Sequence, residues 1–173
     1  SFVMKKILLV YPPFCTPASP AFSITNLYSF LKSNCDAEIE VLDLNIEFHK
    51  QKFGEYREYY KDTGKWDDYD SRTDEYKKLS SKTYSENNNK VIEGNKPELL
   101  DEMLKLINDK KADVVAFSIV YSSQAFYAYS LLKELKNTVI GGPAVNEKLR
   151  SVAGKTLNNE MELLEHIEGR KID

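Results

Sequence analysis

The residues best suited to hold a ligand are two consecutive glycines, Gly141 and Gly142, which directly follow the apolar run 138–140. Because glycine has no side chain, such a pair lets a flat or bulky group lie against the backbone. A tight turn that needs a positive φ explains the pair equally well. Ser118 ends a second apolar run, and its hydroxyl is a candidate donor into the same place. A buried serine bonded to its own strand or helix is the alternative.

The loop after the first apolar run argues against a nucleotide phosphate. Residues 5–11 are followed by Pro12 and Pro13, which have no backbone N–H to donate. A dinucleotide site uses G-x-G-x-x-G at this point so that amides reach the pyrophosphate. The sequence has neither this motif nor a Walker loop. Asp43 resembles a ribose-binding acid, but without the glycines we interpret it as a solvated loop acid.

Neither a catalytic set nor a metal site is predicted. His49 and His166 fall in helical or connecting regions, so we expect both on the surface and away from the ligand-binding loops. Cys15 and Cys35 form no C-x-x-C pattern, which is typical of free thiols in a cytoplasmic protein and not of zinc or iron–sulfur ligands.

A parallel sheet would bring the candidate residues together. Continuous apolar runs of this length are typical of strands covered on both faces. We predict strands over 5–11, 38–44, 113–119 and 138–140, a weak fifth strand over 151–157, and helices over 21–33, 98–109, 125–136 and 160–167. The predicted fold class is therefore α/β, with a flavodoxin-like or Rossmann-like parallel sheet of 4–5 strands flanked by helices.

About 70 residues separate the second and third predicted strands, more than one crossover helix requires. We predict a helical insertion over about 45–95. A narrow stripe at mixed three- and four-residue spacing indicates a helix there, and it comprises Trp66, Tyr69, Thr73, Tyr76 and Leu79. The run 87–89 is expected to end this helix, and Pro97 to open the next one.

Composition limits the remaining possibilities. The chain has 173 residues and a net charge of −3, so we expect one soluble domain over 5–168 without a general attraction to nucleic acid or to anionic membranes. No apolar run approaches the ~20 residues of a membrane span. Residues 1–4 are expected to be a cloning remnant before a native start at Met4. The expected location is the cytoplasm.

Ligands of open α/β sheets bind beyond the carboxyl ends of the strands, where the strand order reverses. The loops 12–20, 119–124 and 141–145 are predicted to meet there. The order of the segments 6–13, 43–47, 115–124, 135–136 and 139–143 resembles the N-terminal cobalamin-binding domain of cobalamin-dependent radical SAM enzymes. The resemblance covers nearly the whole chain except the tyrosine-rich insertion.

The resemblance implies a role for each matching residue. Ser118 and Val120 stand at the S-x-L motif, and Gly141 and Gly142 stand at the glycine pair, which together would line the slot for the nucleotide tail of cobalamin. The D-x-H-x-x-G motif that supplies a lower histidine ligand is missing, as is common in this branch. The full set of cofactor-binding residues implied is Pro13, Phe14, Ser118, Val120, Tyr121, Ser122, Gly141, Gly142 and Pro143.

The resemblance also implies what lies outside the chain. The family continues through a GEGE-like turn into a radical SAM barrel, and 158–162 stands near that turn without its glycines. S-adenosylmethionine and a 4Fe-4S cluster would then belong to a barrel domain or to a partner, in cis or in trans. The leading hypothesis is a cobalamin-binding module that is not itself catalytic. The alternatives are a degenerate domain of the same fold that acts in structure or protein interaction, and a flavodoxin-like flavin binder.

Overall fold

The structure, a computed structural model, describes residues 4–16, 22–57 and 69–172. Its centre is a five-stranded sheet with the order β2-β1-β3-β4-β5, in which every neighbouring pair is parallel. The strands are β1 (Lys6–Tyr11), β2 (Glu38–Asp43), β3 (Val114–Ser118), β4 (Thr138–Gly141) and β5 (Lys155–Thr156). This order is that of the flavodoxin-like α/β fold, so the predicted fold class is confirmed.

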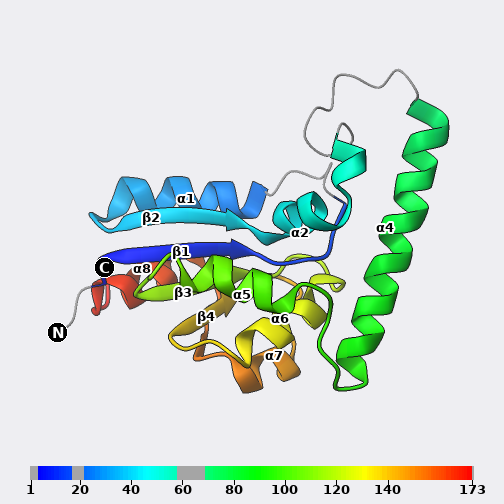
Figure 1. The fold of residues 1–173 in the computed structure, drawn as a ribbon. Helices are drawn as coiled ribbons and strands as arrows, with labels where there is room; N and C mark the ends of the chain where they lie inside the picture. Colours follow the sequence, from blue (N-terminus) through cyan, green and yellow to red (C-terminus); the bar gives the residue numbers. More distant parts are fainter. Residues whose placement is uncertain (1–3, 17–21, 58–68, 173) are drawn as a thin grey trace.

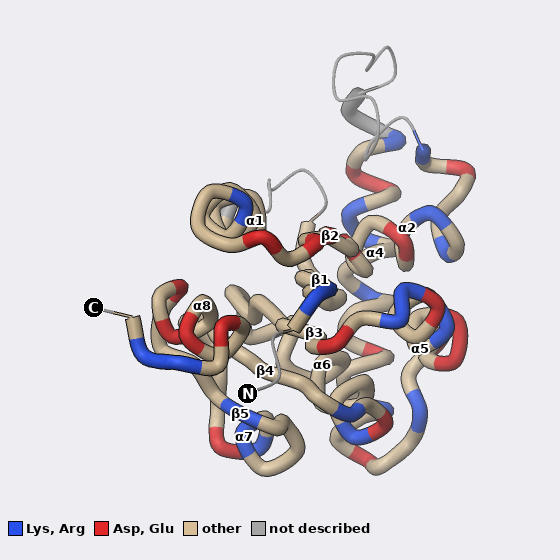
Figure 2. Tube along the Cα trace, turned by 90° about the vertical axis from the view of Figure 1, so that its left-hand side faces the viewer, with Lys and Arg blue, Asp and Glu red and all other residues tan. Residues whose placement is uncertain are grey.

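Helices cover both faces of the sheet (Figure 2). The helices α1 (Phe22–Asn34) and α8 (Glu160–Glu168) bury Ile24, Leu31 and Leu163 against one face. On the other face lie α2 (Leu44–Lys52), α5 (Leu100–Asn108), α6 (Gln124–Leu132) and α7 (Glu147–Val152). All five residues of β3 are buried, because both of its faces are covered.

The predicted helical insertion is confirmed and contains a long helix, α4 (Tyr69–Ile92), besides α2 and a 3-10 turn, η1 (Gly54–Tyr56). The arrows of β1 and β2 point toward α4, which stands across that end of the sheet (Figure 1). The buried stripe of α4 is largely polar and comprises Thr73, Tyr76, Ser80, Thr83, Asn87 and Val91. Within the predicted stripe, Thr73 and Tyr76 are buried and Leu79 is exposed, while Trp66 lies outside the described residues.

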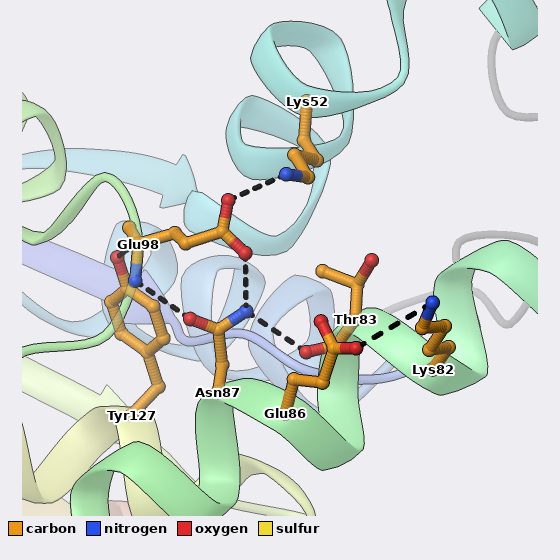
Figure 3. Close-up of polar contacts among 7 residues, drawn as sticks. All are labelled: Lys52, Lys82, Thr83, Glu86, Asn87, Glu98 and Tyr127. Atoms are coloured by element: carbon orange, nitrogen blue, oxygen red, sulfur yellow. Dashed lines mark hydrogen bonds and ion pairs between the residues drawn. The ribbon is translucent and has the colours of Figure 1, made fainter.

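A polar cluster fixes the C-terminal half of α4 to its neighbours (Figure 3). The Asn87 side chain donates to the Thr83 carbonyl oxygen at 2.9 Å and to Glu98 Oε1 at 3.1 Å, and its Oδ1 accepts from the Glu98 backbone N–H at 2.6 Å. Lys52 of α2 pairs with the Glu98 carboxylate at 2.5 Å, and the Tyr127 hydroxyl of α6 donates to the Glu98 carbonyl at 2.6 Å. The segment before α5 therefore ties α2, α4 and α6 together.

Several predicted boundaries were wrong. The prediction that 87–89 ends a helix fails because Asn87 is completely buried and bonded inside α4, which continues to Ile92. Pro97 does not open α5, which begins three residues later after Leu99 in a left-handed conformation, with φ 61°. The predicted fifth strand over 151–157 is also wrong for its first half. Residues 151 and 152 belong to α7, which begins after Asn146, whose side chain caps the helix by accepting from Leu149 N–H.

In the described part of the chain, no helix combines the length and the apolar character that a membrane crossing needs.

Candidate functional site

A cavity of about 190 Å³ lies on the α1 and α8 face of the sheet, at the carboxyl ends of β3 and β4. Its position matches the general location of ligand sites in parallel α/β sheets, beyond the ends of the strands. Apolar side chains and a few polar groups line it, and they are Ser23, Leu27, Ala116, Phe117, Ser118, Val139, Ile140, Gly141, Gly142, Leu157, Asn158, Asn159, Glu160 and Leu163. Seven of these fourteen residues have apolar side chains and five have polar ones, so the wall is more polar than the predominantly apolar lining that is usual for a small-molecule site.

Ser118 provides a hydroxyl in this cavity. It ends β3 opposite Gly141 of β4 and is 92 % buried, being 8 % exposed. Its Oγ lies 3.1 Å from the Oγ of Ser23 on α1. One of the two hydroxyls donates to the other, so the second proton of the pair is available to a ligand atom.

Gly141 and Gly142 exclude a side chain for different structural reasons. Gly142 has φ +116°, and a Cβ at this position would overlap the backbone carbonyl of Ile119. This carbonyl comes close because it also accepts from Ala144 N–H at 3.0 Å. Gly142 is thus required by the turn after β4 with or without a ligand. At Gly141 a Cβ would lie 3.2 Å from the Leu157 carbonyl oxygen, which is a tighter contact than most side chains make.

The remaining predicted site residues lie apart from the cavity. Pro13 is buried in the loop after β1, and Pro143 is exposed beside a second hollow. Val120 is half-buried against the α1 and α8 core, while Tyr121, 43 % exposed, and Ser122 form the rim after β3. Of the nine predicted residues, the cavity brings together Ser118, Gly141 and Gly142.

Phe14 occupies a different place from the one expected of a ligand-binding residue. Its side chain is completely buried on the other face of the sheet. Its ring stacks on Tyr84 of α4 at 4.7 Å between centroids and meets Phe48 and Tyr127 edge-on at 4.8 and 5.4 Å. The Phe14 side chain therefore anchors the loop after β1 in the core and does not face the cavity.

The loops after β1 and β3 are bonded to each other. Gln124 donates from Nε2 to the Pro12 carbonyl at 2.7 Å, and its Oε1 accepts from the backbone N–H groups of Val120 and Tyr121. Ser123 Oγ donates to the Phe14 carbonyl at 2.5 Å. The strand order reverses between β1 and β3, so these bonds join the two loops at the switch point of the sheet.

His49 is not a surface residue, which corrects the prediction. It is completely buried, because α4 covers α2 at this point. Tyr84 donates its hydroxyl proton to the Cys15 carbonyl at 2.9 Å, so its oxygen accepts from His49 Nε2–H at 2.6 Å, and Tyr76 then donates to Nδ1. Burial lowers the pKa of His49 to about 3, in agreement with a neutral ring. His166 is half-buried and lies near the C-terminal end of α8.

Asp43 and Cys15 also have structural partners. Asp43 is the N-cap of α2, accepting from Ile46 N–H at 3.0 Å, and burial raises its pKa, so it is not the solvated loop acid predicted. Asn45 bonds both the N–H and the carbonyl of Cys15, at 3.1 and 2.9 Å. Burial raises the pKa of the Cys15 thiol to about 11. Within the described ranges, no three His, Cys, Asp or Glu side chains are placed to hold a metal ion.

The sequence patterns did not indicate the part of the cavity wall that comes from α1, from α8 and from the residues after β5. Ser23 and Leu27 of α1 and Leu163 of α8 face the cavity, as do Asn158 and Asn159 after β5. A usable signal was present, since residues 158 and 159 also follow a strand and so lie at the carboxyl edge of the sheet.

Comparisons with protein-family models, with curated proteins and with solved structures gave no match for this chain. The class to which it belongs is therefore defined by its own geometry. It is an α/β protein of flavodoxin-like topology with a cavity at the carboxyl ends of β3 and β4.

Proposed function

We propose that this chain is a cobalamin-binding module. The observation that carries the proposal is the cavity at the ends of β3 and β4, with Ser118 and Gly141 in its wall and Gly142 at the turn above them. The cavity wall thus combines the serine and the glycine pair that the sequence resemblance assigns to the nucleotide tail. Bound cobalamin would supply cobalt chemistry, such as methyl transfer, to a radical SAM enzyme in cis or in trans.

The size of the cavity fits one part of this ligand. Sites that enclose a whole drug-sized ligand have volumes of about 300–1,000 Å³, whereas this cavity has about 190 Å³. It would accept a single flat ring system, such as the base of the nucleotide tail, between Leu27 and the sheet. The corrin ring would remain outside, over the exposed rim that includes Tyr121 and Ser122.

The histidines of the chain favour binding without a lower ligand from the protein. Both ring nitrogens of His49 are hydrogen-bonded to tyrosine hydroxyls in the core. His166 is six residues beyond Glu160 on α8, about 9 Å farther along the helix axis from the cavity mouth.

A flavin is less well accommodated than cobalamin. In flavodoxin-like folds the flavin site is the crevice between the strands at which the order reverses, here β1 and β3. The bonds from Ser123 and Gln124 to the loop after β1 occupy that crevice, and Pro12 and Pro13 offer no amide to a phosphate.

A second candidate is a protein-interaction module of the same fold without a cofactor. It is favoured by Gly142, whose conformation is required by packing against Ile119 even when nothing is bound.

Binding of hydroxocobalamin distinguishes the two candidates. The protein is incubated with excess hydroxocobalamin, passed through a size-exclusion column and examined by its visible spectrum. We expect the red cofactor to co-elute with the protein, and the EPR spectrum of its Co(II) form to lack splitting from an axial nitrogen. Absence of binding at high micromolar cofactor would exclude the proposal in favour of the interaction module. Nitrogen splitting would show that the base of the cofactor's own tail or a histidine coordinates cobalt, and would contradict binding of that base in the cavity without a lower ligand.

A further inference from the structure

A second hollow adjoins the cavity. It has a volume of about 380 Å³ and is lined by Gly142, Pro143, Val145, Arg150, Thr156, Leu157 and Asn158. Three of these residues, Gly142, Leu157 and Asn158, also line the cavity at the ends of β3 and β4. A ligand with its ring in the cavity would therefore extend past Gly142 into this hollow.

The charges around the two hollows are separated. Arg150 of α7 is the one cation among the described residues that line either of them, and Glu160 is the one carboxylate, on the wall of the cavity alone. Arg150 is exposed and takes part in none of the ion pairs formed within the described ranges. Its guanidinium is thus available to bind an anion. The nearby hydroxyl of Thr156 is neutral and would not repel that anion.

We infer that Arg150 binds the phosphate of the ligand whose ring occupies the cavity, and so selects complete cobalamin over cobinamide, which lacks the nucleotide tail. The inference rests on the proposed function. A planar guanidinium presents paired N–H donors that match two oxygens of a phosphodiester. Because the hollow is open to solvent, the contact between Arg150 and the phosphate adds selectivity, while burial of the ring in the cavity supplies most of the affinity.

The test combines two ligands with two proteins. Affinities for hydroxocobalamin and for dicyanocobinamide are measured by absorbance titration for the wild type and for Arg150→Gln. We expect Arg150→Gln to weaken cobalamin binding by about tenfold or more, the lower limit for one hydrogen bond to a charged group, and to leave cobinamide binding unchanged. Arg57→Gln is the matched control, since Arg57 is exposed and lines neither the cavity nor the second hollow.

Each outcome has a distinct meaning. Equal affinity of Arg150→Gln and wild type for cobalamin, or an equal loss for both ligands, would overturn the role of Arg150 and leave the proposed function standing. Absence of cobalamin binding to the wild type would overturn the proposed function instead. In that case a preference of the wild type for flavin mononucleotide over riboflavin, lost in Arg150→Gln, would support Arg150 as the phosphate partner of a different ring.

Discussion

Replacement of Asn87 by alanine should strongly destabilise the fold, because Asn87 joins α4 to the segment before α5. The change removes the acceptor of the Glu98 N–H, and an unpaired buried N–H costs about 1–3 kcal/mol. It also removes the bond from Nδ2 to the Glu98 carboxylate, which adds about 1 kcal/mol. Water reaches this half-buried carboxylate and offsets part of the loss. We expect a net decrease of roughly 1–3 kcal/mol in the free energy of unfolding.

Asn89→Ala is the matched control. Asn89 is exposed on the same helix, so both substitutions gain the same ~0.5 kcal/mol of helix propensity. Their difference therefore reports the buried hydrogen bonds of Asn87. The measurement is urea unfolding followed by circular dichroism, with linear extrapolation to water. In a thermal melt the same difference corresponds to about 2–4 °C per kcal/mol for a domain of this size. If the two variants agree within about 0.5 kcal/mol, the Asn87–Glu98 cluster does not hold α4 in place.

Two further predictions use the same unfolding assay. Below a pH of about 6.5 the unfolded chain binds a proton at His49 that the folded chain, with a His49 pKa of about 3, does not accept, so stability should fall on acidification. The decrease of the unfolding free energy per pH unit should be smaller in His49→Gln than in the wild type between about pH 6.5 and 5, a range above that where carboxylates titrate. An identical decrease in both proteins would show that His49 is accessible to protons. Gly142→Ala should cost at least about 2 kcal/mol more than Gly94→Ala, because both glycines have a positive φ but only at Gly142 does a Cβ overlap backbone, that of Ile119. Equal losses would mean that the turn after β4 can shift.

The sheet could be predicted from the sequence because its strands are nearly continuous apolar runs. In β1 and β3 both faces are covered, so the pattern itself reports burial. The position of β4 followed from the same signal and from Gly141 and Gly142 at its end. The short edge strand β5 has only two residues, and so small a segment carries no period that distinguishes it from the end of α7.

The packing of α4 could not be predicted because its buried stripe is polar. Thr73, Ser80, Thr83 and Asn87 are buried, whereas pattern analysis assigns such residues to the solvent side. The same difficulty applies to His49, which is buried under α4, where Tyr76 and Tyr84 bond its two ring nitrogens. These partners are 27 and 35 residues away in sequence.

The candidate site was predicted in part. Topology located the carboxyl ends of the strands as the place for a ligand, and Ser118, Gly141 and Gly142 lie there. The cavity opens at the ends of β3 and β4, however, and not between β1 and β3, where the strand order reverses. The side of the sheet on which the cavity opens depends on how α1 and α8 pack against the sheet. No local sequence pattern predicts the distance between these helices and the sheet. Phe14 was assigned to the site because its loop follows β1, but its backbone turns the ring into the opposite core.

The most direct test of the cobalamin proposal fills the cavity from its exposed side. Ser23 is exposed on α1 with its Oγ 3.1 Å from Ser118 Oγ, so Ser23→Trp should block the slot without disturbing the core. Ser29→Trp on another face of the same helix is the control, since Ser29 is exposed and does not line the cavity. Equilibrium dialysis against hydroxocobalamin should give an affinity at least about tenfold lower for Ser23→Trp, and one equal to the wild type for Ser29→Trp. Equal binding by both variants would contradict the assignment of the cavity to the cofactor tail.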